Sequence, residues 1–379
     1  MITRLEVDGF KSLRSFAVNL EPFTVLIGPN GAGKSNVLEA IGLLSRLNEG
    51  PEDALKGGRG RASDQFSRYR SEAVREIQFH VEMLEFGRGD HGKDGAASLA
   101  KRFRHNLSLA KTATAGGVEH VKMKYGCRYI PRETDDWLSA HPEWAERVPE
   151  SSDRSEVGYM PDFDFVELHA ANLRESSDRI DSGTLAADGS NLPSVLASLP
   201  DDALGEIRSE LAALVPGVAN FEIVESDDSY RIEFQMRDGD AVPARLISNG
   251  TLRVLALLTA VYSERSWSSV LCIEEPENGL YPGRLRRLVD LLREVTGMST
   301  QRERSEPPSP QVIISTHSPV ILAALQDHRQ HLRFIDTVQR GKFRVTRARP
   351  VGEQEGRDTI SMAAISAILD DVARREEDR

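Results

Sequence analysis

The residues best suited to chemistry in this chain lie at positions 28–35, where the sequence reads GPNGAGKS. This spacing fits the pattern G-x-x-x-x-G-K-[ST], in which a lysine and a hydroxyl residue follow the last glycine. Gly31 and Gly33 allow backbone conformations that turn successive N–H groups toward an anion. Lys34 would reach the terminal phosphates of a nucleotide, and Ser35 would offer its hydroxyl to Mg²⁺, which prefers oxygen ligands. A turn that only reverses the chain needs neither side chain, so the segment predicts a phosphate-binding loop.

Two carboxylates after the apolar run at residues 270–273 could supply the other half of a nucleotide site. Such a run predicts a buried parallel strand, and α/β sheets bind ligands at the carboxyl ends of these strands. We expect Glu274 to hold Mg²⁺ through water, and Glu275 to orient or deprotonate the attacking water. His317 follows a second apolar strand, at residues 312–314, and would place an imidazole near the γ-phosphate. An acidic loop or a strand-end histidine alone is usually structural, but together with a phosphate-binding loop they favour catalysis.

The phosphate-binding loop lies between an expected strand and an expected helix. Residues 23–27 form a short apolar, β-branched run, and residues 36–47 place apolar side chains at helical spacing. Residues 2–7 and 16–20 also read as strands. Residues 49–71 are rich in glycine and arginine, and we expect them to form a loop.

Four segments resemble motifs of the ABC-type ATPases. They are similar to the Walker A, signature, Walker B with D-loop, and switch-histidine motifs, and lie at residues 28–35, 247–251, 272–282 and 315–319. The likeness is to the SMC/RecF/OLD-like branch of bacterial AAA family ATPases. It implies an α/β fold, a P-loop NTPase of ABC-ATPase type with a two-lobed mixed β-sheet flanked by helices and an inserted α+β region.

The resemblance also implies a set of site residues. The nucleotide contacts would come from Pro29, Asn30, Gly31, Ala32, Gly33, Lys34, Ser35, Asn36, Ser248 and Gly250. The catalytic residues would be Glu275, Lys34, His317 and Glu274, with ATP and Mg²⁺ as cofactors and with Ser35 and Glu274 as metal ligands. In this family two heads enclose two ATP molecules, so Ser248 and Gly250 would face the γ-phosphate of a second copy in a homodimer.

This chain departs from the family pattern at two positions. The signature reads Ser-Asn-Gly-Thr rather than Ser-Gly-Gly-Gln, and Glu274 replaces the usual aspartate. Gln78 is the candidate for the Q-loop glutamine, and Lys11 and Arg14 are candidates for contacts to the base or ribose.

The chain has 379 residues, which is longer than one ordinary domain. Of these residues 39% are hydrophobic and 28% are charged, a composition typical of a globular protein. We expect four parts. They are an ATPase N-terminal lobe with Walker A at 1–86, an insertion at 87–190, an ATPase C-terminal lobe with signature, Walker B and switch histidine at 191–340, and a C-terminal strand and helix at 341–379.

Composition restricts the compartment and the partners. The net charge of -11 argues against a surface uniformly basic for nucleic acid, although it allows a local basic groove. Two cysteines are too few for a disulfide framework or a zinc site, and they fit a reducing cytoplasm. We find no run of apolar residues long enough to span a membrane and expect a cytoplasmic protein without a membrane partner.

These observations favour an ATP-dependent dimerising switch in DNA maintenance or anti-phage defence, with DNA as a further partner. The alternative is a low-turnover ATP-binding scaffold that gates a separately encoded effector protein such as a nuclease. A nuclease activity of the chain itself is disfavoured, because no acidic metal-binding cluster follows His317. A transporter subunit is disfavoured by the atypical signature and the long insertion.

Overall fold

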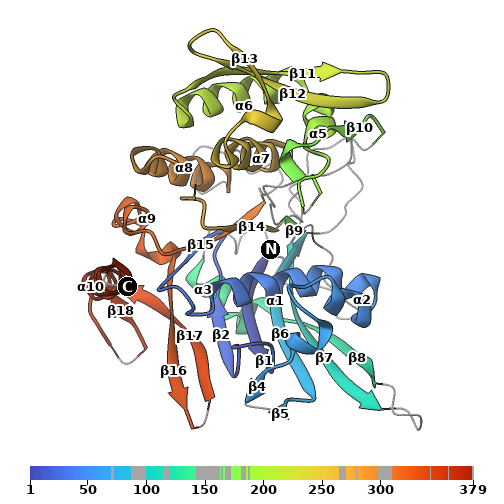
Figure 1. Ribbon diagram of the computed structural model, residues 1–379. Coiled ribbons are helices and arrows are strands. Elements are labelled where there is room, and N and C mark those ends of the chain that lie inside the picture. Colours follow the sequence, from blue (N-terminus) through green and yellow to red (C-terminus); the bar gives the residue numbers. More distant parts are fainter. Residues whose placement is uncertain are drawn as a thin grey trace.

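A computed structural model describes most of the chain, in two parts that Figure 1 shows one above the other. The described residues are 1–69, 72–86, 100–113, 119–141, 163, 165–166, 172–180, 185–186, 188–263, 270–278, 280–296, 310–341, 343–356 and 358–377. Within these ranges the strands form sheets of seven, five, four and two strands.

The seven-stranded sheet positions the candidate site. Its strands run in the order β18 (Ile360–Ser361), β17 (Phe343–Gly352), β16 (Leu332–Arg340), β3 (Phe23–Ile27), β15 (Gln311–Thr316), β14 (Val270–Glu274) and β9 (Phe165–Val166). Strands β16, β3, β15 and β14 pair in parallel, and every residue of β3 and β15 is buried. The carboxyl ends of β3, β14 and β15 therefore meet at one edge, as the apolar runs in the sequence predict.

A five-stranded antiparallel sheet forms the second layer of the lower part. Its order is β2 (Phe16–Asn19), β1 (Ile2–Asp8), β6 (Glu76–Phe86), β7 (Ala100–Ala113) and β8 (Glu119–Tyr129). Helix α1 (Lys34–Arg46) shares one apolar core with residues of both sheets, so the helix that follows the loop is held between them. Strands β7 and β8 fall within the expected insertion, yet β7 pairs with β6 and β8 pairs with β7, so both continue the sheet of β1 and β6. The division into parts at residues 86 and 190 stays a prediction.

The expectation that residues 49–71 form only a loop is wrong in part. The segment contains η1 (Leu47–Glu49), α2 (Pro51–Lys56), η2 (Ala62–Gln65) and β4 (Arg68–Tyr69), which pairs with β5 (Glu72–Ala73). Pro51 occupies the first turn of α2, where its fixed φ suits a helix, and Ala54 and Leu55 are buried. Burial of these two side chains stabilises a helix that the local composition does not predict.

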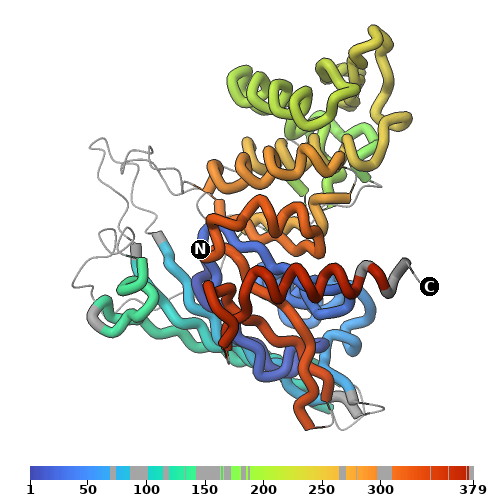
Figure 2. Tube along the Cα trace, turned by 90° about the vertical axis from the view of Figure 1, so that its left-hand side faces the viewer, coloured from blue at the N-terminus to red at the C-terminus, as the bar shows by residue number. Residues whose placement is uncertain are grey.

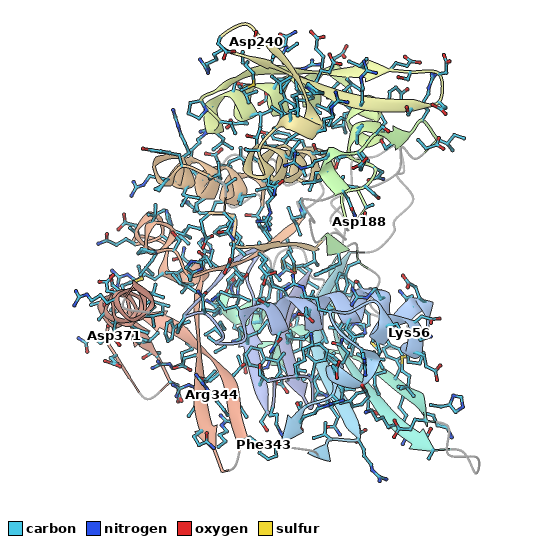
Figure 3. The ribbon with its side chains drawn as sticks, viewed as in Figure 1. Lys56, Asp188, Asp240, Phe343, Arg344 and Asp371 are labelled. Carbon is cyan, nitrogen blue, oxygen red and sulfur yellow. The ribbon has the colours of Figure 1, made fainter. Side chains whose placement is uncertain are left out.

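The upper part surrounds α7 (Asn249–Ser263), most of whose residues are buried. Its other elements are η4 (Asn172–Arg174), β10 (Ser177–Asp178), α5 (Leu192–Ser198), α6 (Asp201–Leu214), β11 (Val218–Glu225), β12 (Ser229–Met236), β13 (Ala241–Pro243), η5 (Ala244–Leu246) and α8 (Pro282–Val295). Strands β11 and β12 pair as an antiparallel hairpin, and α5, α6 and α8 each bury apolar side chains. Polar side chains cover its outer strands, with Asp240 at the β12–β13 turn (Figure 3).

The C-terminal residues return to the lower part. They form α9 (Pro319–Ala324), η6 (Arg329–His331) and α10 (Met362–Glu377), while η3 (Arg132–Thr134) and α3 (Asp136–Ala140) follow β8. Figure 2 shows α10 crossing in front of the two sheets. Ile365 and Leu369 of α10 are buried in the core that contains β3 and β15. Among the described helices, none is both long and apolar enough to cross a membrane.

Candidate nucleotide-binding site

The P-loop connects β3 to α1 in a conformation that requires glycine. Gly31 has φ 73° and Gly33 has φ 100°, both in the left-handed region that side chains disfavour. Gly28 is required for a different reason, since a Cβ there would lie less than 3.0 Å from the backbone oxygen of Ile335 on β16. The loop is therefore built against the neighbouring parallel strand.

Thr346 and Ser12, which the sequence analysis did not single out, support this loop. Thr346 of β17 donates its hydroxyl to the carbonyl oxygen of Ala32 at 3.0 Å and lies 2.6 Å from the hydroxyl of Ser12. Asn36, in the first turn of α1, donates to Ser12 at 2.7 Å. Because these partners are hundreds of residues apart in sequence, no local pattern could have identified Thr346.

Lys34 is buried at the start of α1, and its ammonium points back into the loop. Nζ donates to the carbonyl oxygens of Gly28 at 2.8 Å and Pro29 at 3.1 Å. Burial lowers the pKa of Lys34, and the nearby carboxylates, with Glu275 first, offset part of that effect. The ammonium is thus already desolvated where terminal phosphate oxygens would bind.

Ser35 and Glu274 meet across the site and provide hard oxygen donors. The Ser35 hydroxyl donates to Oε1 of Glu274, and Arg59 donates to Oε2 of the same carboxylate. Burial alone would raise the pKa of Glu274, but the bonds from Arg59 and Ser35 lower it below its usual value. An ionised carboxylate beside a hydroxyl fits Mg²⁺, which takes oxygen ligands and usually keeps waters and phosphate oxygens for its other positions.

Ser35 and Glu274 are not part of a larger cluster of metal-ligating side chains among the described residues. The described residues contain no group of three or more His, Cys, Asp and Glu side chains arranged for a metal ion. A metal at Ser35 and Glu274 would thus depend on the nucleotide for further ligands.

Glu275 and His317 lie side by side after the ends of β14 and β15. Glu275 Oε1 is 3.1 Å from His317 Nδ1, and its Oε2 accepts a bond of 2.8 Å from Asn278. Glu275 has φ 47°, a conformation that costs a non-glycine residue about 1–3 kcal/mol and that is common at functional sites. Its backbone N–H donates to Ser315 at 2.8 Å, which holds it beside the end of β15.

Glu277 is a site residue to which the sequence analysis assigned no role. Its Oε1 accepts the Thr316 hydroxyl at 2.6 Å and the His317 backbone N–H at 3.3 Å. It therefore fixes the turn that carries His317. The signal that could have identified it is the third glutamate of the Glu-Glu-Pro-Glu run at residues 274–277.

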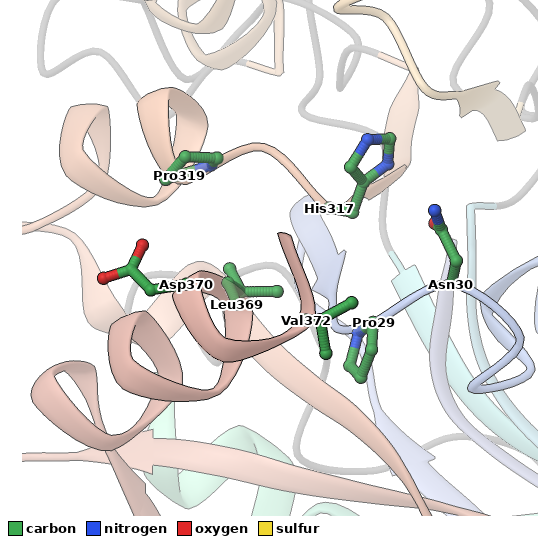
Figure 4. A pocket seen from close by; sticks show the side chains of 7 residues that line it. All are labelled: Pro29, Asn30, His317, Pro319, Leu369, Asp370 and Val372. Atoms are coloured by element: carbon green, nitrogen blue, oxygen red, sulfur yellow. The ribbon is translucent and has the colours of Figure 1, made fainter. Parts of the chain in front are cut away.

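A cavity of about 110 Å³ lies where the P-loop, the strand-end histidine and α10 meet (Figure 4). Its lining residues are Pro29, Asn30, His317, Pro319, Leu369, Asp370 and Val372. It is smaller than the pockets of about 300–1,000 Å³ that enclose whole ligands, and its lining residues do not include Lys34, Ser35 or Glu274. Helix α10 forms one of its walls.

The two signature residues lie elsewhere, at the start of α7 in the upper part. The hydroxyl of Ser248 accepts the Thr251 N–H at 3.2 Å and so caps the helix, and Gly250 is buried behind it. In the part of the chain that the structure describes, no hydrogen bond or ion pair joins either residue to the P-loop or to Glu275. Among the described residues, the signature therefore has no direct polar contact with the rest of the predicted site.

The remaining candidates do not enter the site. Lys11 pairs with Glu39 of α1, and the Arg14 guanidinium stacks on the ring of Phe343 at 3.8 Å. Gln78 is exposed on β6, in the antiparallel sheet rather than at the edge that carries the P-loop.

Two family models match the chain. A family model described as "AAA domain, putative AbiEii toxin, Type IV TA system" matches residues 128–323, more than half of the chain. The chain belongs to this AAA family. A second model, described as "AAA ATPase domain", matches residues 1–82. The resemblance to AAA family ATPases is confirmed.

Curated relatives of this AAA family chain match over short segments. "Structural maintenance of chromosomes protein 1" of Schizosaccharomyces pombe is 51% identical over 45 residues, 11% of this chain and 4% of that protein. "OLD nuclease" of Thermus scotoductus is 46% identical over 44 residues, 12% of this chain and 8% of that protein. "DNA replication and repair protein RecF" of Acinetobacter baylyi is 42% identical over 45 residues, 12% of this chain and 13% of that protein. The match thus spans only a small part of each relative.

Solved structures show the fold over nearly the whole chain. A crystal structure of the SmcHead bound to the C-winged helix domain of ScpA has a TM-score of 0.54 at 18% identity, covering 93% of this chain and 98% of that one. The Smc head domain with a coiled coil and joint from Pyrococcus yayanosii has a TM-score of 0.53 at 13% identity, covering 98% and 99%. The expected P-loop NTPase fold of ABC-ATPase type is confirmed.

Proposed function

We propose that the chain binds ATP with Mg²⁺ and hydrolyses it, with Glu275 as the group that activates water. The observation that carries this proposal is the placement of Glu275 between His317 and Asn278, on a left-handed backbone, next to the carboxylate that meets Ser35. A carboxylate held on both oxygens is well placed to orient a water molecule. When bound, Mg²⁺ would neutralise charge on the phosphates and would be held by Ser35 and Glu274.

The other residues of the site contribute binding and orientation. Lys34 exchanges the carbonyl oxygens of Gly28 and Pro29 for phosphate oxygens, and the N–H groups at the start of α1 face the same anion. His317 holds Glu275 at 3.1 Å and would place its imidazole near the terminal phosphate. Most of the rate enhancement in such a site comes from positioning and electrostatics rather than from covalent chemistry.

We propose further that two copies close on ATP as a homodimer, with Ser248 and Gly250 completing the site of the other copy. The lack of a direct polar contact between them and the P-loop, among the described residues, supports this arrangement. Leu246 precedes the signature and is 69% exposed, and Tyr281 follows the Walker B segment and is 78% exposed. Exposed large apolar side chains, aromatic ones above all, are common at protein interfaces.

DNA is the further partner that we propose, for a role in DNA maintenance or defence. The names of two relatives refer to chromosomes and to DNA replication and repair. Lys122, Lys124 and Arg128 are exposed at alternating positions of β8 and so share one face of an edge strand. Basic side chains gathered on a chain of net charge -11 would contact phosphates and make binding salt-dependent.

A low-turnover scaffold that gates a separate effector is the second candidate. The Ser-Asn-Gly-Thr signature and the glutamate at position 274 favour it, since both depart from residues associated with turnover in this family. The two candidates differ in whether the biological effect needs hydrolysis or only ATP binding.

Steady-state ATP hydrolysis by the wild type and Glu275→Gln tests the proposed activity. We expect the variant to lose about 100-fold or more in turnover while keeping its affinity for ATP, because only the activation of water is removed. Glu222→Gln, an exposed glutamate on β11, is the matched control and should hydrolyse ATP normally. Equal turnover in wild type and Glu275→Gln would contradict the proposal, and stimulation by DNA would identify the partner class.

A further inference from the structure

An arginine that the proposed hydrolysis does not use contacts the proposed metal ligand. Arg59 lies between α2 and η2, and its Nη2 donates to Oε2 of Glu274. The hydroxyl of Ser35 donates to Oε1 of the same carboxylate. Both oxygens of Glu274 are therefore engaged in this structure, one by the P-loop and one by a cation of the chain itself.

The backbone of Arg59 is held by two hydrogen bonds, whereas its side chain is exposed over about half of its surface. Its carbonyl oxygen accepts bonds from Gln65 at 3.0 Å and from Lys11 at 3.3 Å, and Gln65 is almost fully buried. The backbone N–H of Lys11 donates in turn to Gln65 at 2.9 Å. The side chain of Arg59 is 47% exposed, so its guanidinium could exchange partners without any rearrangement of the segment that carries it.

The charges around the guanidinium explain why it lies there. Glu274 and Glu39 are both mostly shielded from water, with side chains 23% and 9% exposed, and Arg59 Nε is 4.0 Å from Oε1 of Glu39. Desolvated carboxylates need a compensating cation. A divalent ion approaching Glu274 must displace the guanidinium as well as shed water, which weakens its binding.

A nucleotide changes this balance because it offers Arg59 another anion. The planar fork of guanidinium donors matches phosphate as well as carboxylate, and a triphosphate bound in the P-loop would bring its oxygens beside Ser35 and Glu274. We propose that Arg59 is a positioning residue that keeps divalent cations off Glu274 until nucleotide arrives, so that metal and nucleotide enter together. This inference rests on the proposed function, in which Ser35 and Glu274 hold the metal.

Such a device couples two binding events. If nucleotide raises the affinity of the site for metal by releasing Arg59, metal must raise the affinity for nucleotide by the same factor. Removal of the guanidinium should therefore strengthen metal binding to the nucleotide-free chain and reduce the coupling.

Binding of Mn²⁺ to the full-length chain without nucleotide, followed by electron paramagnetic resonance, tests the proposal. Arg59→Gln should bind Mn²⁺ about tenfold tighter than the wild type or more, as expected when a charge-assisted bond no longer competes. Arg59→Ala should behave alike, which separates loss of the charge from any effect of the new amide. Arg61→Gln changes an exposed arginine of the same segment and should match the wild type.

A double variant tests whether the Mn²⁺ ion binds at Glu274. Adding Glu274→Gln to Arg59→Gln should abolish the gain, and a gain that survives would place the ion elsewhere and overturn the proposal. Equal Mn²⁺ affinity in the wild type and Arg59→Gln would also overturn it. If the wild type fails to bind Mn²⁺ even with a non-hydrolysable ATP analogue, the proposed function itself fails, which distinguishes the two failures.

Discussion

Replacement of Gly33 by alanine should destabilise the chain far more than the same change at Gly31. Both glycines have positive φ, 100° and 73°, and a left-handed conformation costs an alanine about 1–2 kcal/mol. At Gly31 a Cβ would meet nothing within 4 Å. At Gly33 it would lie less than 3.0 Å from Thr346 Oγ1 and Ser12 Oγ, which adds about 1–3 kcal/mol for displaced packing. We expect a loss of about 1–2 kcal/mol for Gly31→Ala and about 2–5 kcal/mol for Gly33→Ala.

Urea unfolding followed by circular dichroism measures both losses. Thr346→Ala provides an internal check, because it removes the hydroxyl that the new Cβ would meet. The double change Gly33→Ala with Thr346→Ala should cost less than the sum of the single changes, as expected for neighbouring residues that share one contact. Equal losses for Gly31→Ala and Gly33→Ala, or strict additivity with Thr346→Ala, would refute the role assigned to β17 in supporting the P-loop.

Three further changes test other parts of the structure. Burial lowers the pKa of His331 to about 4, so the folded chain holds this imidazole neutral. The contribution of His331 to the free energy of unfolding is therefore highest above pH 6.5 and decreases as the pH falls toward 4, because the unfolded chain binds the proton first. His331→Phe should flatten that part of the stability curve, by up to about 3 kcal/mol, in thermal unfolding between pH 4 and 8, and an unchanged slope would contradict the assignment. Glu277→Ala should cost about 1–3 kcal/mol in urea unfolding, because the Thr316 hydroxyl and the His317 N–H lose their acceptor. Glu277→Gln keeps an acceptor oxygen and should recover most of that loss. Equal losses for the two variants would show that the charge of Glu277 matters instead. Leu369→Ala, a buried position on α10, should cost about 2–5 kcal/mol in thermal unfolding, and a loss below ~1 kcal/mol would show that α10 is not part of the core.

The centre of the site could be predicted because each part of it is encoded locally. The glycine pattern before Lys34 and the carboxylates after an apolar strand are readable from short segments. Parallel pairing of β14 and β15 then brings Glu275 and His317 together, since the carboxyl ends of parallel strands share an edge.

The supporting residues could not be predicted because their partners are distant in sequence. Thr346 and Arg59 acquire their roles only when β17 and the segment after α2 pack against the P-loop and Glu274. Helix α2 was missed for a similar reason, since burial of Ala54 and Leu55 outweighs the glycine-rich composition around it. The pairing of β7 onto β6 likewise depends on a register that no local pattern specifies.

The molecular mass of Glu275→Gln in the presence of ATP and Mg²⁺, measured by light scattering, tests the central claim most directly. This variant should hold ATP without hydrolysing it, so the account predicts the mass of one chain with ADP and of two chains with ATP. Adding Ser248→Arg should restore the mass of one chain with ATP, because the signature would no longer fit the site of the other copy. A variant that binds ATP yet keeps the same mass with ATP and ADP would contradict an ATP-dependent homodimer.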